Sequence, residues 1–210
     1  MTDHENKFAA YFKQALETFA TTGDSDQVLT FATSLQGNDG DYRDSVLSEF
    51  AKLLAARAEL DDAMRYCLAI PDLLERSDAM FGVAAQLVTC KNPDGAKRFL
   101  FAAIESGEAA ESSESATVLL QISGLLQHLG EMKDALNILN RAAMLASKKP
   151  QSFEAGETLR GCARLLASWD RLSEAVGVAN TIESPGLKQT ALEEIHGRGK
   201  WPVYPGVPIE

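Results

Sequence analysis

The apolar positions of the chain recur in a spacing that is typical of paired helices. In four stretches a large residue is followed by further large residues three and seven positions later, with a small residue at the fourth position. Large residues with this spacing share one face of a helix, and the small residue marks where another helix approaches closely. A second alanine follows each small residue by twelve positions, which gives the pairs Ala51 and Ala63, Ala84 and Ala96, Ser123 and Ala135, and Ala163 and Ala175. Each stretch therefore predicts a first helix packed against a second one.

A weaker copy of the pattern opens the chain, with Leu16 and Val28 in place of the two small residues. The second positions of the five copies, at residues 28, 63, 96, 135 and 175, are separated by 35, 33, 39 and 40 residues. Prolines fall between the predicted helices, where a missing N–H group is tolerated, at Pro71, Pro93, Pro150 and Pro185. The pattern predicts five helical hairpins and a closing helix around residues 186–196.

The fourth copy matches a known repeat best, through Leu119, Ile122, Ser123, Leu126, Gly130, Ala135, Leu139 and Ala142. Over residues 8–185 the chain resembles the tetratricopeptide repeat family, although the leading tryptophan is absent, leucine holds the tyrosine position and the late proline is displaced. The resemblance implies an all-α fold, a right-handed α-solenoid of about five antiparallel helical hairpins. A related solenoid of helical hairpins would show the same spacing. We expect residues 1–197 to form a single domain, followed by an extended, Pro- and Gly-containing tail over residues 198–210.

If the resemblance holds, the first helices line a concave groove, and the residues beside each apolar stripe are exposed in it. The candidate binding residues are Lys13, Glu17, Lys52, Phe81, Leu120, Gln121, Arg160 and Arg164. Phe81 and Leu120 stand outside the core stripes, so they are either ligand contacts or additional packing between repeats.

Arg160 and Arg164 are four positions apart and therefore share one helical face. Together they could hold a carboxylate or an acidic peptide segment. The alternative is that they bond to local acids such as Glu157.

The charge of the chain changes the range of expected partners. Thirty acidic and twenty basic residues give a net charge of −10, and such a protein repels the phosphate backbone of nucleic acids. Residues 1–111 hold 19 acids and 10 bases, whereas residues 112–210 hold 11 and 10. We therefore expect a protein or peptide partner and no nucleic acid, with a basic partner favoured near the first repeats.

The residues that usually carry catalysis do not converge in any known motif. No phosphate-binding glycine loop, nucleophile-elbow motif or zinc-binding histidine pair is present, and His4, His128 and His196 lack partners at ligand spacing. The cysteines at positions 67, 90 and 162 are typical of free buried thiols in a reducing compartment. We predict no catalytic residue, metal or cofactor, and a protein that is not an enzyme.

No apolar run is long enough to span a bilayer, and the N-terminus lacks the layout of a signal peptide. We expect no membrane association and a cytoplasmic location.

In the tail, Trp201 and Tyr204 are apolar residues spaced by proline and glycine, which are typical of an extended ligand-like segment. The tail could cap the last helices, enter the groove of a neighbouring copy in a homo-oligomer, or recruit another protein.

These observations favour a non-catalytic scaffold or adaptor that binds a protein or peptide segment in its concave groove. The alternative is a regulatory or chaperone-like subunit that holds a client, or associates with itself, through its convex face and tail.

Overall fold

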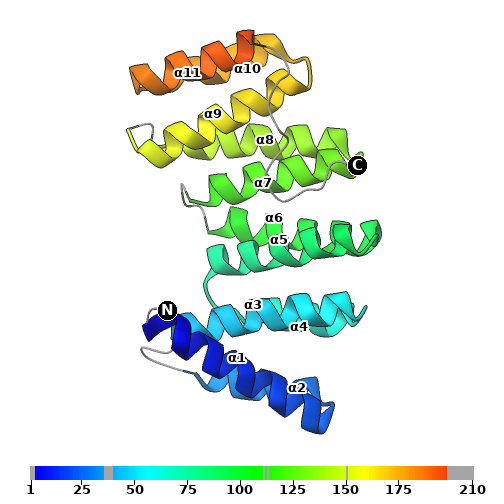
Figure 1. Ribbon diagram of the computed structural model, residues 1–210. Helices are drawn as coiled ribbons and strands as arrows, with labels where there is room; N and C mark the ends of the chain where they lie inside the picture. The colour runs from blue at the N-terminus through cyan, green and yellow to red at the C-terminus, as the bar shows by residue number, and fades with distance from the viewer. Residues whose placement is uncertain (1–2, 36–39, 111, 113, 150, 198–210) are drawn as a thin grey trace. The chain divides into compact units, whose positions relative to one another are not determined.

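The fold was analysed in a computed structural model that describes residues 3–35, 40–110, 112, 114–149 and 151–197. Within these residues the chain forms helices and no strand, as Figure 1 shows. The helices are α1 (Asp3–Thr22), α2 (Ser25–Ser34), α3 (Gly40–Ala56), α4 (Leu60–Leu68), α5 (Leu73–Thr89), α6 (Pro93–Ala109), α7 (Ser115–His128), α8 (Met132–Ala146), α9 (Phe153–Ser168), α10 (Leu172–Asn180) and α11 (Pro185–His196). The predicted all-α class, the pairing of neighbouring helices and the closing helix are confirmed. Trp201 and Tyr204 lie outside the described residues.

The chain divides into two compact units, an N-terminal unit over Met1–Ala103 and a C-terminal unit over Ile104–Glu210, so that the division falls within α6. In the N-terminal unit α1 packs on α2, α3 on α4, and the first helices α1, α3 and α5 contact one another in order. In the C-terminal unit α7 packs on α8 and α9 on α10, while α9 contacts α7 on one side and α11 on the other. The predicted grouping of residues 1–197 into a single domain stays a prediction.

All five turns that connect a first helix to its second helix contain a residue with a positive φ at the same position. This residue has a φ between 59° and 83° and stands seven positions after the small residue, or after Leu16 in the first hairpin, and five before its partner. These residues are Gly23, Ala58, Lys91, Gly130 and Asp170. Glycine adopts such a φ without strain, whereas other residues have a steric cost of about 1–2 kcal/mol.

In the last four of the five turns, the last leucine of the first-helix stripe closes the turn as a hydrogen-bond acceptor, whereas in the first turn Gly23 itself donates its N–H to the carbonyl of Phe19 at 2.7 Å. The residue after the left-handed position donates its N–H to the carbonyl of Leu54, Leu87, Leu126 or Leu166, at 2.9–3.0 Å. This is the Schellman arrangement that satisfies a helix C-terminus. All four leucine side chains are buried, so one residue both fills the core and fixes the turn.

The spacing of twelve residues follows from the contact that the turn creates. Ser123 donates its hydroxyl to the carbonyl oxygen of Ala135 at 2.8 Å, and both residues are fully buried. The corresponding alanines in the second, third and fifth hairpins are also fully buried. The two helices of each hairpin meet closely at these positions, where a larger side chain would push them apart.

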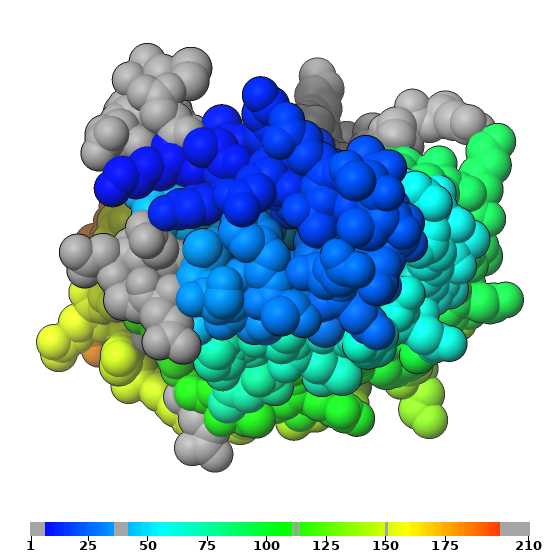
Figure 2. All heavy atoms as spheres, turned by 90° about the horizontal axis from the view of Figure 1, so that it is seen from below, coloured from blue at the N-terminus to red at the C-terminus, as the bar shows by residue number. Residues whose placement is uncertain are grey.

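Side chains between hairpins add further contacts within the N-terminal unit. The ring of Phe50 on α3 lies 5.3 Å from those of Phe19 on α1 and Tyr66 on α4, and the Tyr66 hydroxyl donates to the Ser25 carbonyl at 2.5 Å. Arg65 on α4 pairs with Asp26 on α2 at 2.5 Å. Figure 2 shows this unit from the side of α1 and α2, which lie against each other in blue. Aromatic packing therefore ties the first hairpin to the second.

One prediction about the cysteines is wrong. Cys67 and Cys162 are buried, and burial raises the pKa of each thiol to about 12. Cys90 is exposed, because it lies at the C-terminal end of α5, where that helix meets its turn. None of the helices within the described residues is both long and apolar enough to cross a membrane.

Candidate functional site

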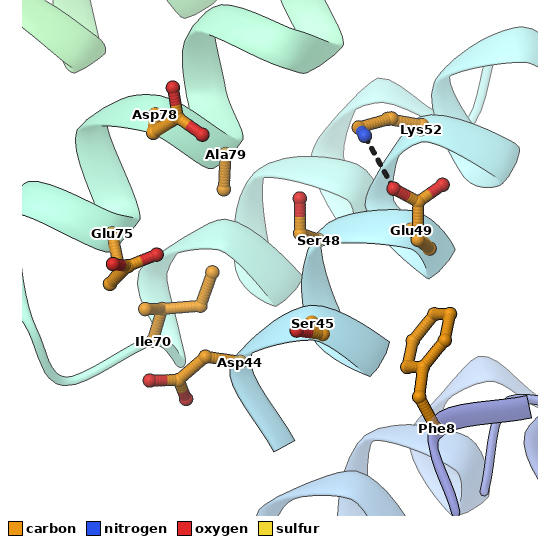
Figure 3. Close-up of a pocket in the computed structure, with 10 residues that line it drawn as sticks. All are labelled: Phe8, Asp44, Ser45, Ser48, Glu49, Lys52, Ile70, Glu75, Asp78 and Ala79. Atoms are coloured by element: carbon orange, nitrogen blue, oxygen red, sulfur yellow. Dashed lines mark hydrogen bonds and ion pairs between the residues drawn. The ribbon is translucent and has the colours of Figure 1, made fainter. Parts of the chain in front are cut away.

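The first helices of the N-terminal unit enclose an open cavity of about 380 Å³ between α3 and α5. Positions 45, 48, 49 and 52 of α3 face it because they recur at helical spacing, and positions 75, 78 and 79 of α5 do the same opposite them. Figure 3 shows the lining residues, which are Phe8, Asp44, Ser45, Ser48, Glu49, Lys52, Ile70, Glu75, Asp78 and Ala79. We refer to this cavity as the acidic pocket.

Carboxylates outnumber cations in the acidic pocket by four to one. The ammonium group of Lys52 is 2.5 Å from Glu49 Oε1, and its stem lies 3.0 Å from the point where a Cβ at Gly82 would stand. Gly82 on α5 therefore leaves room for the lysine stem. Asp44 pairs with Arg43 at 2.6 Å. The negative charge of Glu49 and Asp44 is thus balanced by neighbours within the chain.

Asp78 differs from the other carboxylates of the pocket. Its residue surface is exposed, yet the protein around the carboxyl group raises its pKa through burial, an effect that the charge of Lys52 opposes. Burial disfavours the charged form because part of the hydration shell is lost. A cation placed in the pocket would restore favourable interactions to this carboxylate.

A smaller cavity of about 270 Å³ lies between α7 and α9 in the C-terminal unit. Its lining residues are Thr117, Leu120, Glu154, Glu157, Thr158, Arg160, Gly161 and Arg164. The hydroxyl groups of Thr117 and Thr158 are 2.9 Å apart and join the two walls. We refer to this cavity as the arginine pocket.

Arg160 is held by acids of its own unit. Its Nη2 is 3.0 Å from Glu157 Oε2, and its Nε is 3.9 Å from Glu194 Oε2 on α11. The Glu194 side chain is 9% exposed, and its Oε2 has no hydrogen bond within the described residues. Arg160 thus balances a buried carboxylate of the closing helix, which is the kind of local contact that the sequence left open as an alternative.

The eight predicted binding residues lie in different environments. Lys52 lines the acidic pocket, and Leu120, Arg160 and Arg164 line the arginine pocket, although Leu120 is only 4% exposed. Lys13 and Glu17 form an exposed ion pair on α1 at 3.6 Å. Phe81 and Gln121 are half-buried and line neither pocket.

Sequence reasoning missed most of the acidic pocket. It selected Lys52 but not Phe8, Asp44, Glu75 or Asp78. The sequence did contain a signal for these residues. Positions one and two turns before Lys52 on α3, and one and two turns before Gly82 on α5, share a helical face with those residues, and they line the acidic pocket. Among the described residues no group of three or more His, Cys, Asp and Glu side chains is arranged to hold a metal ion.

Comparison with known proteins adds information on the fold alone. No family model and no curated protein matches the chain. The structure is similar to that of Ton1535 from Thermococcus onnurineus NA1, with 17% identity and a TM-score of 0.50 over 88% of this chain and 57% of the other. It is also similar to BtubC (BKLC) from P. vanneervenii, with 12% identity and a TM-score of 0.45 over 100% of this chain and 99% of the other. The chain thus spans a little over half the length of the first of these proteins, and the second likeness is too low to support an argument.

Proposed function

We propose that the protein is a non-catalytic scaffold or adaptor that binds protein segments in pockets between its successive first helices. The observation that carries the proposal is the composition of the acidic pocket, which is lined by four carboxylates together with the apolar side chains of Phe8, Ile70 and Ala79. Such a site suits a basic, partly apolar segment, because a lysine or arginine side chain places its aliphatic stem on apolar surface and its charged end on a carboxylate.

The proposal also includes the type of helical repeat and the handedness of the fold. We assign the chain to a tetratricopeptide-like right-handed α-solenoid. The five equivalent turns and the repeated close contact of small residues support this assignment, because each hairpin is built to one plan. In such a fold the first helices supply the binding surface, and both pockets lie between first helices of one unit.

A binding measurement with matched variants tests the acidic pocket. The probe is a short fluorescein-labelled peptide of lysine, leucine and serine, and the control probe has glutamate in place of lysine. We expect the basic probe to bind the wild type, and Asp78→Lys to weaken binding about tenfold or more, since a hydrogen bond to a charged group contributes about 1.5–3 kcal/mol. Binding should also weaken as the pH falls, at a higher pH than for an ordinary carboxyl group, because the pKa of Asp78 is raised.

The control variant is Glu105→Lys, which makes the same change of charge at an exposed position of α6 outside the pocket. Equal weakening by Glu105→Lys and Asp78→Lys would mean that the net charge alone attracts the peptide. Failure of the wild type to bind the basic probe, or equal binding of that probe by the wild type and Asp78→Lys, would remove the acidic pocket as a recognition site.

The arginine pocket is tested separately with the acidic probe. We expect Arg164→Gln to weaken binding of that probe, and Lys133→Gln on the exposed surface of α8 to leave it unchanged. The same affinity in all three proteins would show that the arginines serve only the local acids.

A further inference from the structure

The closing helix α11 has two faces, and only one of them is covered by the described part of the chain. Ala191 and Ile195 are buried, and Leu187 Cδ1 lies 2.9 Å from the point where a Cβ at Gly156 would stand. Gly156 on α9 thus makes room for Leu187, and α11 contacts α9 and α10. The inner face of α11 is therefore part of the core of the C-terminal unit.

The outer face of α11 carries an open groove of about 440 Å³. Within the described residues its lining belongs to α11 and recurs at helical spacing: Pro185, Lys188, Gln189, Leu192, Glu193 and His196. The polar atoms at its edge are partly satisfied within the helix, since Gln189 Nε2 donates to Glu193 Oε1 at 2.9 Å and His196 Nδ1 lies 2.6 Å from the Leu192 carbonyl. The surface that a partner could contact therefore consists mainly of the Pro185 ring, the Leu192 side chain and the aliphatic stem of Lys188.

The segment that follows α11 has the composition and reach to cover this groove. Residues 198–210 include Trp201, Tyr204 and three prolines, which favour an extended conformation that offers apolar side chains without helix formation. Trp201 is five positions after His196, and five extended residues span about 17 Å. The groove extends eleven positions along α11, which is also about 17 Å at the rise of a helix. The indole can therefore reach any part of the stripe.

The direct covalent connection to α11 favours residues 198–210, over a second copy of the chain, as the occupant of this groove. A segment joined to its site by a few residues has an effective concentration on the order of millimolar, well above a protein concentration in the micromolar range. Weak docking on a small surface is therefore sufficient in cis, whereas a separate chain would need much greater affinity. The positive charges of Arg198 and Lys200 also complement Glu193 at the edge of the groove.

We propose that residues 198–210 dock in cis on the outer face of α11, with the indole of Trp201 over Leu192. Lys188 is placed to contact the face of that ring, as cations do with tryptophan. The docked segment covers the last helix in the way that a terminal capping element covers the end of a repeat array.

Fluorescence of Trp201 tests the proposal, because the chain contains only two tryptophans. In a Trp169→Phe background Trp201 is the sole reporter, and the free peptide of residues 197–210 provides the undocked reference. We expect a blue-shifted emission and lower acrylamide quenching in the protein than in the peptide. Leu192→Asp should raise quenching about twofold or more, because most molecules then release the segment.

The matched control is Met144→Asp, which places the same charge on an exposed apolar side chain of α8. It should leave the emission of Trp201 unchanged, and circular dichroism establishes that each variant is folded. If Leu192→Asp does not fold, Leu192→Ser replaces it with the same expected direction, because it removes the apolar contact without adding a charge.

Three results would overturn the proposal. Quenching of the Trp169→Phe protein equal to that of the free peptide would mean that the segment does not dock. Protection that disappears on dilution would assign the site to a second copy of the chain. Protection that is lost in Arg164→Glu but kept in Leu192→Asp would place the segment in the arginine pocket.

Discussion

At the scale of single residues, three of the five hairpin turns hold a side chain in a backbone conformation that favours glycine. Ala58, Lys91 and Asp170 have φ values of 65°, 59° and 59°. Nothing lies within 4 Å of a Cβ built at Gly23 or Gly130, so the turn itself has space for a side chain and only the backbone disfavours it. The strain at the three positions is therefore conformational.

We expect Lys91→Gly to stabilise the protein by about 0.5–1 kcal/mol and Gly130→Ala to destabilise it by about 1 kcal/mol. Urea unfolding followed by circular dichroism measures both changes. Gly177→Ala is the control, since Gly177 lies inside α10 with open space around it, and alanine there should add about 1 kcal/mol of stability. Destabilisation by Lys91→Gly would show that the turn does not store this strain.

The three thiols should differ in reactivity. Cys90 is exposed, whereas Cys67 and Cys162 are buried with a pKa of about 12, so at neutral pH they are neutral and shielded. We expect a thiol reagent to label the native protein rapidly at Cys90 and to label the other two only after denaturation, as read by mass spectrometry of the peptides. Cys90→Ser should abolish the rapid phase, and rapid labelling of Cys162 in the native protein would contradict the burial described here.

At the scale of elements, the sequence predicted the helices and their pairing because both follow from local periodicity. The twelve-residue spacing is visible in the sequence, but its cause is not. The structure shows that cause, which is a recurring turn that brings two small residues together. The longer intervals in the later part of the chain had no explanation in the sequence. The structure places the additional residues in the second helices, since α6 and α8 have 17 and 15 residues whereas α2 and α4 have 10 and 9.

The candidate site was less predictable than the helices. The pocket residues come from α1, α3, α5 and the segment after α4, and their meeting depends on how hairpins pack, which no local pattern encodes. Arg160 was identified by its position on a helical face, but its contact with Glu194 joins residues 34 positions apart. Local spacing therefore predicted which faces are available, and tertiary packing decided which residues share a pocket.

The close contact within hairpins can be tested at Ala84, which is fully buried opposite Ala96. We expect Ala84→Leu to destabilise the protein by about 1–3 kcal/mol, because additional methylene groups force two packed helices apart. The neighbouring Ala85 is only half-buried, so Ala85→Leu should change stability by less than about 0.5 kcal/mol. Urea unfolding compares the two variants, and equal effects would argue against a special requirement for a small side chain at position 84.

At the scale of the whole molecule, the chain divides into two compact units. In a repeat array, stability is approximately a sum of local terms and nearest-neighbour contacts, so a defect acts mainly near its own position. We expect Ala163→Leu in α9 to lower amide exchange protection in α7–α11 by more than in α1–α4. Hydrogen exchange with mass spectrometry measures the change for each segment. A uniform loss along the chain would instead indicate a single cooperative unit.

The constancy of the hairpin turn bears on how such a chain can change in length. In all five hairpins the left-handed residue stands seven positions after the first anchor residue and five before the second, while the intervals between hairpins range from 33 to 40 residues. The differences in length between the repeats therefore lie away from the turn, in the second helices and the segments that follow them. A change of length in the segments between hairpins would therefore leave the register inside each hairpin unchanged, although each hairpin still needs its neighbours to cover its apolar face.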